Sequence, residues 1–198
     1  MHTINELESE LQLNATTKPA SSASIEVGFA EKKQVFDRPP LPVEMASEAP
    51  ITKSPSASVQ LDFESLDCFE AVGDRFAERG VVFNNAIALH PSNPAFPTHS
   101  GSMVMIGAPK AGWLEVNFQC PVQAVSGYVT SSRRTLLIAY DAEDNLLAKD
   151  ELPSSNLAGS DSKIAPNRQL SLKTPNIHRV AFQSLGGQLT VDDLSFKV

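Results

Sequence analysis

The sequence predicts an all-β protein: an antiparallel two-sheet β-sandwich of about ten strands behind a disordered N-terminal tail. Three observations lead to this prediction. Short runs of alternating apolar and polar residues, separated by turn residues, fill the chain from 59 to 198. Within 59–198 only one stretch, 67–79, has a helix-like pattern, and there is no βαβ alternation. Residues 1–58 differ in composition from everything that follows.

The strands are expected where apolar side chains alternate with polar ones. In 59–64, Val59, Leu61 and Phe63 share one face, and the polar residues between them share the other. A turn at 141–145, rich in Asp and Asn, joins two neighbouring strands into a hairpin. The remaining strands, including the two of the hairpin, are expected at 80–89, 103–106, 113–120, 122–130, 134–140, 146–151, 169–173, 177–183 and 188–198.

The tail is expected at 1–58, and the folded domain at 59–198. Residues 14–58 hold six of the fourteen prolines and one glycine. That composition buries too little apolar surface to offset the entropy of ordering. Residues 4–13 have helical spacing over about three turns, so they predict a transient helix or a docking peptide. The prolines at 38–42 favour polyproline II, as a stiff spacer or a recognition peptide.

Charge and hydropathy exclude several classes of partner. The net charge is −7, of which five basic and eight acidic residues in 1–58 give −3, and no basic stripe is present. Nucleic acid is therefore not an expected partner. The longest apolar runs are about five residues, which is too short for a membrane span. The first ten residues carry three glutamates and no apolar stretch, so no signal peptide is readable and the compartment stays open.

The two cysteines, Cys68 and Cys120, have no CxxC or Cys/His context that would indicate zinc or redox chemistry. Cys120 continues an apolar face that includes Val116 and Phe118, which predicts a buried structural thiol. A disulfide between Cys68 and Cys120 is the alternative.

The order of several short motifs resembles that of bacterial surface β-sandwich domains, which are similar to galactose-binding-like jelly rolls and carbohydrate-binding modules. The resemblance spans 59–198. It implies a jelly roll with adjacent first and last strands, a structural calcium near those strands, glycan binding and a cell-surface location. The motifs are LDFESL at 61–66, RGVVF at 79–83, HSGS at 99–102, LEVNF at 114–118, AYDAEDNLL at 139–147, VAF at 180–182 and LTVDDLSF at 189–196.

A calcium site is expected at the last strand. Strict alternation places Asp192 on the same face as Leu194 and Phe196. A buried carboxylate needs a cation or several donors, and calcium prefers hard oxygen ligands. By the resemblance, Asp192 would bind calcium together with Asp62 or Glu64 from the first strand. The alternative is that Asp192 is solvated or capped by backbone N–H groups.

A binding loop is expected at 90–102, which contains three prolines, one aromatic and two imidazoles. Such a loop suits the recognition of a polyhydroxylated ligand by stacking and hydrogen bonding. The alternatives are an ordered connection whose Phe96 fills the core, and a half-buried structural role for Trp113. Neither a zinc spacing nor a nucleophile motif is present. The candidate ligand-binding residues are His90, Asn93, Phe96, His99, Ser100 and Trp113.

Taken together, these patterns predict a non-catalytic binding module that recognises a glycan or another surface polymer through its loops. The alternative is a structural or interaction protein. In that case the β-sandwich is an assembly module, and the N-terminal tail docks to a larger protein partner.

Overall fold

The computed structural model describes residues 57–198. The predicted tail, apart from its last two residues, lies outside this range, as do the possible helix at 4–13 and the proline-rich peptide at 38–42. The described part contains nine strands joined in one antiparallel ladder, which confirms the all-β prediction. None of its helices has the length and apolar character that crossing a membrane requires.

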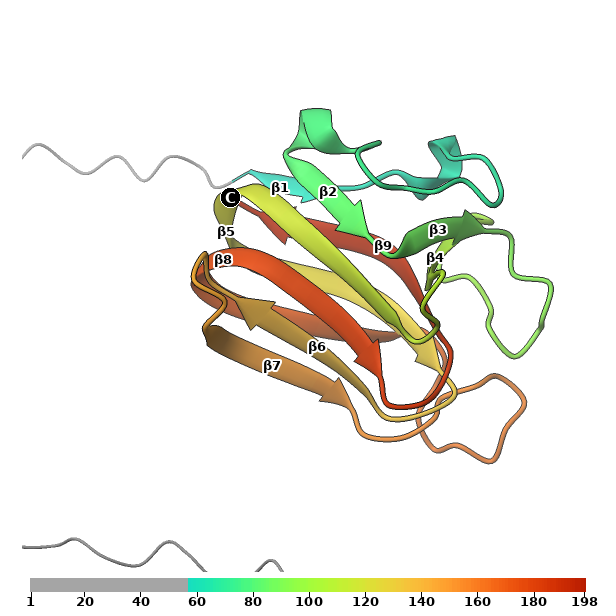
Figure 1. The fold of residues 1–198 in the computed structure, drawn as a ribbon. Coiled ribbons are helices and arrows are strands. Elements are labelled where there is room, and N and C mark those ends of the chain that lie inside the picture. Colours follow the sequence, from blue (N-terminus) through green and yellow to red (C-terminus); the bar gives the residue numbers. More distant parts are fainter. Residues whose placement is uncertain (1–56) are drawn as a thin grey trace, which may run out of the picture. The chain divides into compact units, whose positions relative to one another are not determined.

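Two single-turn 3-10 helices accompany the strands in Figure 1: η1 (Phe63–Ser65) and η2 (Ala77–Arg79). Of the two, η2 lies within the helix-like stretch predicted at 67–79 and accounts for part of that signal. The strands are β1 (Ser58–Gln60), β2 (Val81–Asn84), β3 (Ala86–Leu89), β4 (Val104–Gly107), β5 (Trp113–Ser131), β6 (Thr135–Tyr140), β7 (Leu146–Leu152), β8 (Arg168–Ser184) and β9 (Leu189–Lys197).

Two strands are much longer than expected. β5 unites the strands predicted at 113–120 and 122–130, and β8 unites those predicted at 169–173 and 177–183. Pro121 and Pro175 lie within these two strands, although proline lacks the N–H that a strand ladder needs. The register between β5 and β8 instead shifts between Asn117 and Ala124, so the strands bend and continue.

The bends fold the ladder into two layers. Sheet 1 contains β2, the first half of β5, the second half of β8, β6 and β7. Sheet 2 contains the other halves of β8 and β5, followed by β9, β4 and β3, with β1 also paired to β9. The first and last strands of the described part are thus adjacent, as the resemblance implied.

Contacts across the interior show that the layers face each other. Phe182 pairs with Leu114 on sheet 1. In a flat strand Gly127 would lie about 40 Å from Leu114. A methyl group on Gly127 would nevertheless come within 3.3 Å of the Phe182 ring, so β5 doubles back over β8. Phe118 and Phe196, from opposite layers, have ring centroids 5.2 Å apart.

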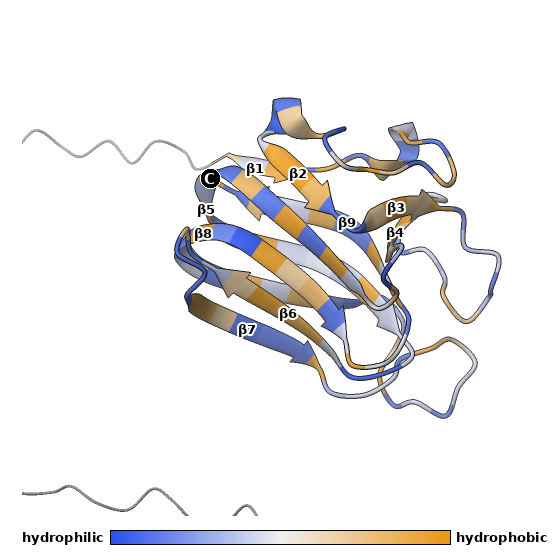
Figure 2. Ribbon diagram, in the orientation of Figure 1, coloured by the Kyte–Doolittle hydropathy of each residue, from blue (hydrophilic) through white to orange (hydrophobic). Residues whose placement is uncertain are grey.

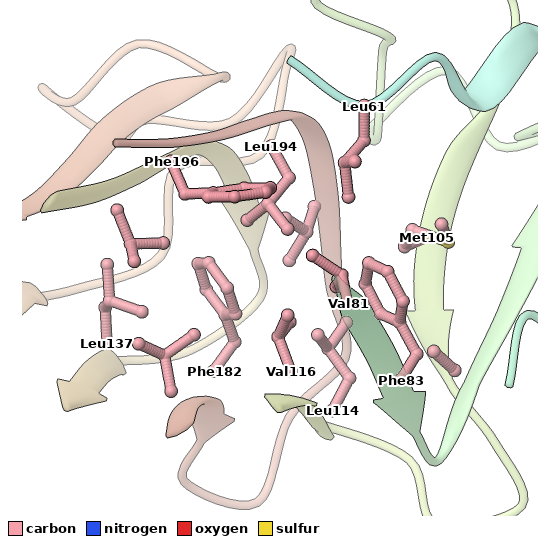
Figure 3. Packing of buried hydrophobic residues seen from close by; sticks show 14 of the residues in the cluster. Leu61, Val81, Phe83, Met105, Leu114, Val116, Leu137, Phe182, Leu194 and Phe196 are labelled. Carbon is pink, nitrogen blue, oxygen red and sulfur yellow. The ribbon is translucent and has the colours of Figure 1, made fainter. Parts of the chain in front are cut away.

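The core lies between the two layers and follows the alternation of the strands (Figure 2). Phe83, Val116 and Leu137 approach from sheet 1 (Figure 3). Leu194 and Phe196 approach from β9 on the other side. Alternation along β6 is strict, with Thr135, Leu137 and Ala139 buried and their neighbours half-buried. Apolar burial of this kind is the main stabilising contribution.

The predicted hairpin is confirmed as β6 and β7. Asp141 fixes its turn, because its Oδ1 accepts the backbone N–H groups of Glu143 at 3.0 Å and of Asn145 at 2.8 Å. Asn145 also donates its side-chain amide to Asp141 Oδ2 at 3.0 Å. An Asp at the start of a turn favours this geometry.

The prediction that Asp192 faces the core beside Leu194 and Phe196 is wrong. Asp192 pairs with Tyr128 and Ser195 pairs with Ser126, so two residues of β9, Asp193 and Leu194, lie opposite one residue of β5. This β-bulge has Asp193 in the left-handed region, at φ 45°. The extra residue reverses the alternation, and Asp192 therefore points outward from sheet 2.

The prediction of a buried Cys120 is also wrong. Both Cys68 and Cys120 are exposed, and they form no disulfide. The inward face of β5 is interrupted after Phe118 and resumes at Val122, and residues 119–121 are exposed where the strand bends. The alternation of buried and exposed residues therefore stops after Phe118, and Cys120 lies in the exposed bend.

Candidate functional site

The 90–102 loop, one of the two predicted sites, is held down by carboxylates. Asp192 is buried under the loop, and its Oδ2 accepts the backbone N–H of His99 at 2.7 Å and that of Ser100 at 3.3 Å. Its Oδ1 accepts the N–H of Asp193 at 2.7 Å. Burial raises the pKa of Asp192, and the three N–H donors offset that rise only in part. This is the backbone-capped alternative considered for Asp192.

Glu64 anchors the other end of the loop. Its carboxylate accepts the N–H of Met103 at 2.9 Å and both the N–H and the hydroxyl of Ser102, the latter at 2.8 Å. Burial alone would raise the pKa of Glu64, but these hydrogen bonds outweigh it and lower the pKa below its usual value. Gly101, at φ 55°, lies so close that a Cβ there would meet the Glu64 carboxylate at 2.4 Å.

Two predicted ligand-binding residues, His99 and Ser100, are engaged by Asp193. Its carboxylate contacts His99 Nδ1 at 2.5 Å and accepts the Ser100 hydroxyl at 2.8 Å. Burial raises the pKa of Asp193, but its hydrogen bonds with His99 and Ser100 outweigh this and lower it. The His99 ring also stacks on Tyr128, with centroids 3.4 Å apart. These side chains therefore act within the protein as a clamp on the loop.

The residues named for calcium come together, since Asp62, Glu64 and Asp192 line one pocket at the start of β9. Their oxygens already accept donors, because Asp62 Oδ1 takes the N–H of Glu64 at 3.1 Å and the other two carboxylates hold the loop. In residues 57–198 no cluster of three or more His, Cys, Asp or Glu is arranged to hold a metal ion. The donor set present fits hydrogen bonding rather than cation coordination. Calcium binding stays a prediction.

The first half of the loop lines a separate pocket. Asn93 and Phe96 lie there with Ile106 and Leu189 from sheet 2. Phe96 is buried beneath the loop, outside the main core cluster. Asn93 Oδ1 accepts the N–H of Ala95 at 3.0 Å. His90 is exposed and turns away, with its Nδ1 2.9 Å from the Ser102 carbonyl oxygen. The structure thus divides the predicted loop site between two locations.

Trp113, the remaining predicted residue, belongs to a different surface. It begins β5 on the outward face of sheet 1, where it is half-buried and pairs with Gln183. Lys110 Nζ lies 5.5 Å from its ring centroid. Register aligns further polar and aromatic side chains on the same face, because directly paired residues point to the same side. We call this set the sheet 1 platform: Asn84, Trp113, Glu115, Asn117, Tyr140, Arg179 and Gln183.

Arg179 organises the centre of the platform. Its Nη1 donates to Glu115 Oε2 at 2.7 Å, its Nη2 donates to Asp144 at 2.8 Å, and its guanidinium lies 4.0 Å over the Tyr140 ring. Burial alone would lower the pKa of Arg179, but hydrogen bonds with Asp144 and Glu115 raise it. The guanidinium is therefore a planar group held in place by two carboxylates, those of Glu115 and Asp144.

The amides of the platform complete this network. Asn84 donates its side-chain N–H to Glu115 Oε1 at 3.0 Å, and Asn117 donates to the same oxygen at 3.3 Å. Glu115 thus holds one guanidinium and two amides in place on neighbouring strands.

Most of the platform was not predicted. The alternation of Trp113, Glu115 and Asn117 between buried Leu114, Val116 and Phe118 was a readable signal for an outward polar face. The platform residues on β6 and β8 are placed beside those of β5 by the register of strand pairing, which the sequence alone does not reveal.

No family model and no curated protein sequence matches the chain. Solved structures with similar folds include a variant of the family 29 carbohydrate-binding module CBM29-2, with 12% identity and a TM-score of 0.36, covering 72% of this chain and 92% of that one. The family 61 module TmCBM61, solved with beta-1,4-galactotriose, has 13% identity and a TM-score of 0.36, covering 67% of this chain and 100% of that one.

A third similar structure is the enzymatically active domain of tailspike protein 4 from bacteriophage CBA120. It has 12% identity and a TM-score of 0.31, and the match covers 66% of this chain and 21% of that one. The resemblance to carbohydrate-binding modules thus recurs among solved structures.

Proposed function

We propose that this protein is a non-catalytic module that binds a glycan on the sheet 1 platform. The observation that carries the proposal is the set of outward planar side chains on sheet 1, with Arg179 over Tyr140 at one level and Trp113 four residues away along β5, and with amides and a carboxylate between them. Aromatic rings offer apolar faces to sugar rings, and fixed amides and charged groups offer hydrogen bonds to hydroxyls. The platform has both, on a rigid sheet.

Preorganisation favours this surface over the 90–102 loop. The side chains of His99 and Ser100 are already occupied by Asp193. On the platform, by contrast, Glu115 fixes Arg179 through its Oε2 and both Asn84 and Asn117 through its Oε1. Rotamers fixed before binding lower the entropic cost of association.

The same contacts favour binding over catalysis. Glycoside hydrolysis requires two carboxyl groups on opposite sides of the scissile bond. At the platform, Glu115 already accepts from three side chains, and Asp144 beside it is paired with the same Arg179, so both carboxylates are engaged on one guanidinium.

The test is binding of the full chain to a panel of immobilised neutral polysaccharides: galactan, mannan, xylan and β-glucan. We expect binding to at least one of them, and about a tenfold or greater loss for Trp113→Ala. Two matched controls lie off the platform. Phe69→Ala removes an aromatic side chain that is 72% exposed, and Arg75→Ala removes an arginine paired with Glu70 at 2.7 Å.

Equal binding by wild type and Trp113→Ala, with both melting alike, would contradict the platform as the site. A folded full-length protein that binds none of the panel would contradict neutral glycan binding. Loss of binding in the Phe69→Ala control as well would place the ligand elsewhere on the surface.

A further inference from the structure

The outward face of sheet 2 carries a second polar surface, separate from the sheet 1 platform. Register places Lys173 and Lys197 on either side of Ala124, with Ser58 next to Lys197. Since neighbouring strands lie about 4.8 Å apart, the two lysine Cα atoms are about 10 Å from each other. Because the side chain of Ala124 between them is small, a ligand can approach the strand there.

A row of hydroxyls follows one step along the same strands. Ser171, Ser126 and Ser195 lie side by side, with the hydroxyls of Ser126 and Ser195 2.9 Å apart. This row is about 6.8 Å from the lysine row, the rise of two strand residues. Both rows line one groove together with Gln169. We call this surface the lysine groove.

The charge of the groove stands out in an acidic protein. The chain carries a net −7, yet both lysines are exposed, and within residues 57–198 neither pairs with a carboxylate. Asp193 lies beyond the serine row, where its carboxylate is held by His99, Ser100 and Gln60. The groove therefore offers two ammonium groups at one end and serine hydroxyls in the middle, where Asp150 accepts the backbone N–H of Ser171 at 2.9 Å.

From this arrangement we infer that the lysine groove binds an acidic polysaccharide, a chain of uronic acids. A carboxylate fits between the two ammonium groups over Ala124, and the hydroxyls of the next sugar fit the serine row. This site is on the opposite layer from the platform and does not depend on neutral glycan binding there.

The experiment measures binding of full-length protein to polygalacturonate, with neutral galactan as comparator, at about 20 mM and 200 mM salt. We expect polygalacturonate to bind and to weaken at high salt, because exposed charges are screened. The Lys173→Ala/Lys197→Ala double variant should lose at least tenfold. Ala124→Glu, which places a carboxylate between the lysines, should lose as much without altering the melting temperature.

The matched control is Lys163→Ala, since Lys163 is an exposed lysine that lines a different pocket. It should bind polygalacturonate like the wild type. Unchanged binding in Ala124→Glu, or equal loss in Lys163→Ala, would overturn the groove as the site. Equally tight binding of single-stranded DNA would overturn the specificity for acidic sugars. Trp113→Ala should leave polygalacturonate binding intact, so failure of either proposal is separately visible.

Discussion

The carboxylate of Asp192 accepts the backbone N–H of His99 at 2.7 Å, although 93 residues separate the two in the sequence. This contact exists because the bulge at Asp193 turns Asp192 out of the core and under the 90–102 loop. Glu64 holds the end of the same loop through Ser102 and Met103. The loop is therefore part of the folded framework and sits on carboxylates from both chain ends of the domain.

Gly101→Ala should destabilise the domain strongly. A side chain at φ 55° costs about 1 to 2 kcal/mol, and the clash with the Glu64 carboxylate adds about 1 to 3 kcal/mol. Gly159→Ala is the control, since φ is 71° there and no atom lies within 4 Å of the added Cβ. Urea unfolding compares the two variants. Equal losses would show that the contact with Glu64 is unimportant.

The pH dependence of stability should have opposite contributions from Glu64 and Asp192. Glu64, whose pKa is lowered on folding from 4.5, stabilises the fold above that value and loses this contribution as pH falls. Asp192, whose pKa is raised from 3.8, gives a contribution that is present at low pH and lost as pH rises.

Melting curves between pH 3 and pH 6 test these signs. Glu64→Gln should flatten the loss of stability toward acid, whereas Asp192→Asn should steepen it. The same slope in both variants would contradict the assignment of their pKa shifts.

Asn156→Ala should lower stability by about 2 to 4 kcal/mol, since a buried amide leaves unsatisfied partners when removed. Asn156 is fully buried, and its Oδ1 accepts the N–H of Ser131 at 2.7 Å. Its amide donates to the carbonyls of Val129 at 2.9 Å and Ala165 at 3.1 Å. Denaturant unfolding measures the loss, with exposed Gln123→Ala as control. A cost near that of Gln123→Ala would refute the role of Asn156 as an anchor of the 153–167 loop.

Arg179→Lys should weaken binding to the neutral polysaccharide by about tenfold. A lysine cannot contact Glu115 and Asp144 together while also lying flat over Tyr140. Arg75→Lys, at an exposed pair with Glu70, should leave binding unchanged. Immobilised-polysaccharide binding distinguishes the two, and retained affinity in Arg179→Lys would show that the planar guanidinium is not needed.

Calcium has a direct test. A cation at Asp62, Glu64 and Asp192 would have to replace N–H donors of the loop. Stabilisation by a bound ion grows with its concentration. A rise in melting temperature with calcium that EDTA reverses and Asp62→Asn abolishes would establish the site. Identical melting in calcium and in EDTA would remove it.

Local alternation predicted most strands, because one face of each strand packs on the core. β6 and β7 and their turn follow directly from this pattern. Alternation failed where the backbone departs from a regular strand. The bulge at Asp193 uses a non-glycine residue at positive φ, and the bend in β5 exposes Cys120. The bulge leaves no distinctive sequence signal, whereas the bend includes Pro121.

The candidate site was predictable only in part. Trp113 was named from residue type, whereas Arg179 and Tyr140 join it through pairing of β5, β8 and β6. Pairing between distant strands depends on register, which is set by the whole core. The 90–102 loop was correctly predicted to be rich in hydrogen-bonding groups. Those groups donate to carboxylates that are far away in the sequence, those of Glu64, Asp192 and Asp193.

Because β5 and β8 run through both layers, neither sheet has a complete set of strands of its own. Opening one layer would strip hydrogen-bond partners from the other. The two halves of each long strand should therefore exchange their amide hydrogens in a single cooperative unit. The platform and the lysine groove, although they face opposite directions, would then be lost and regained together.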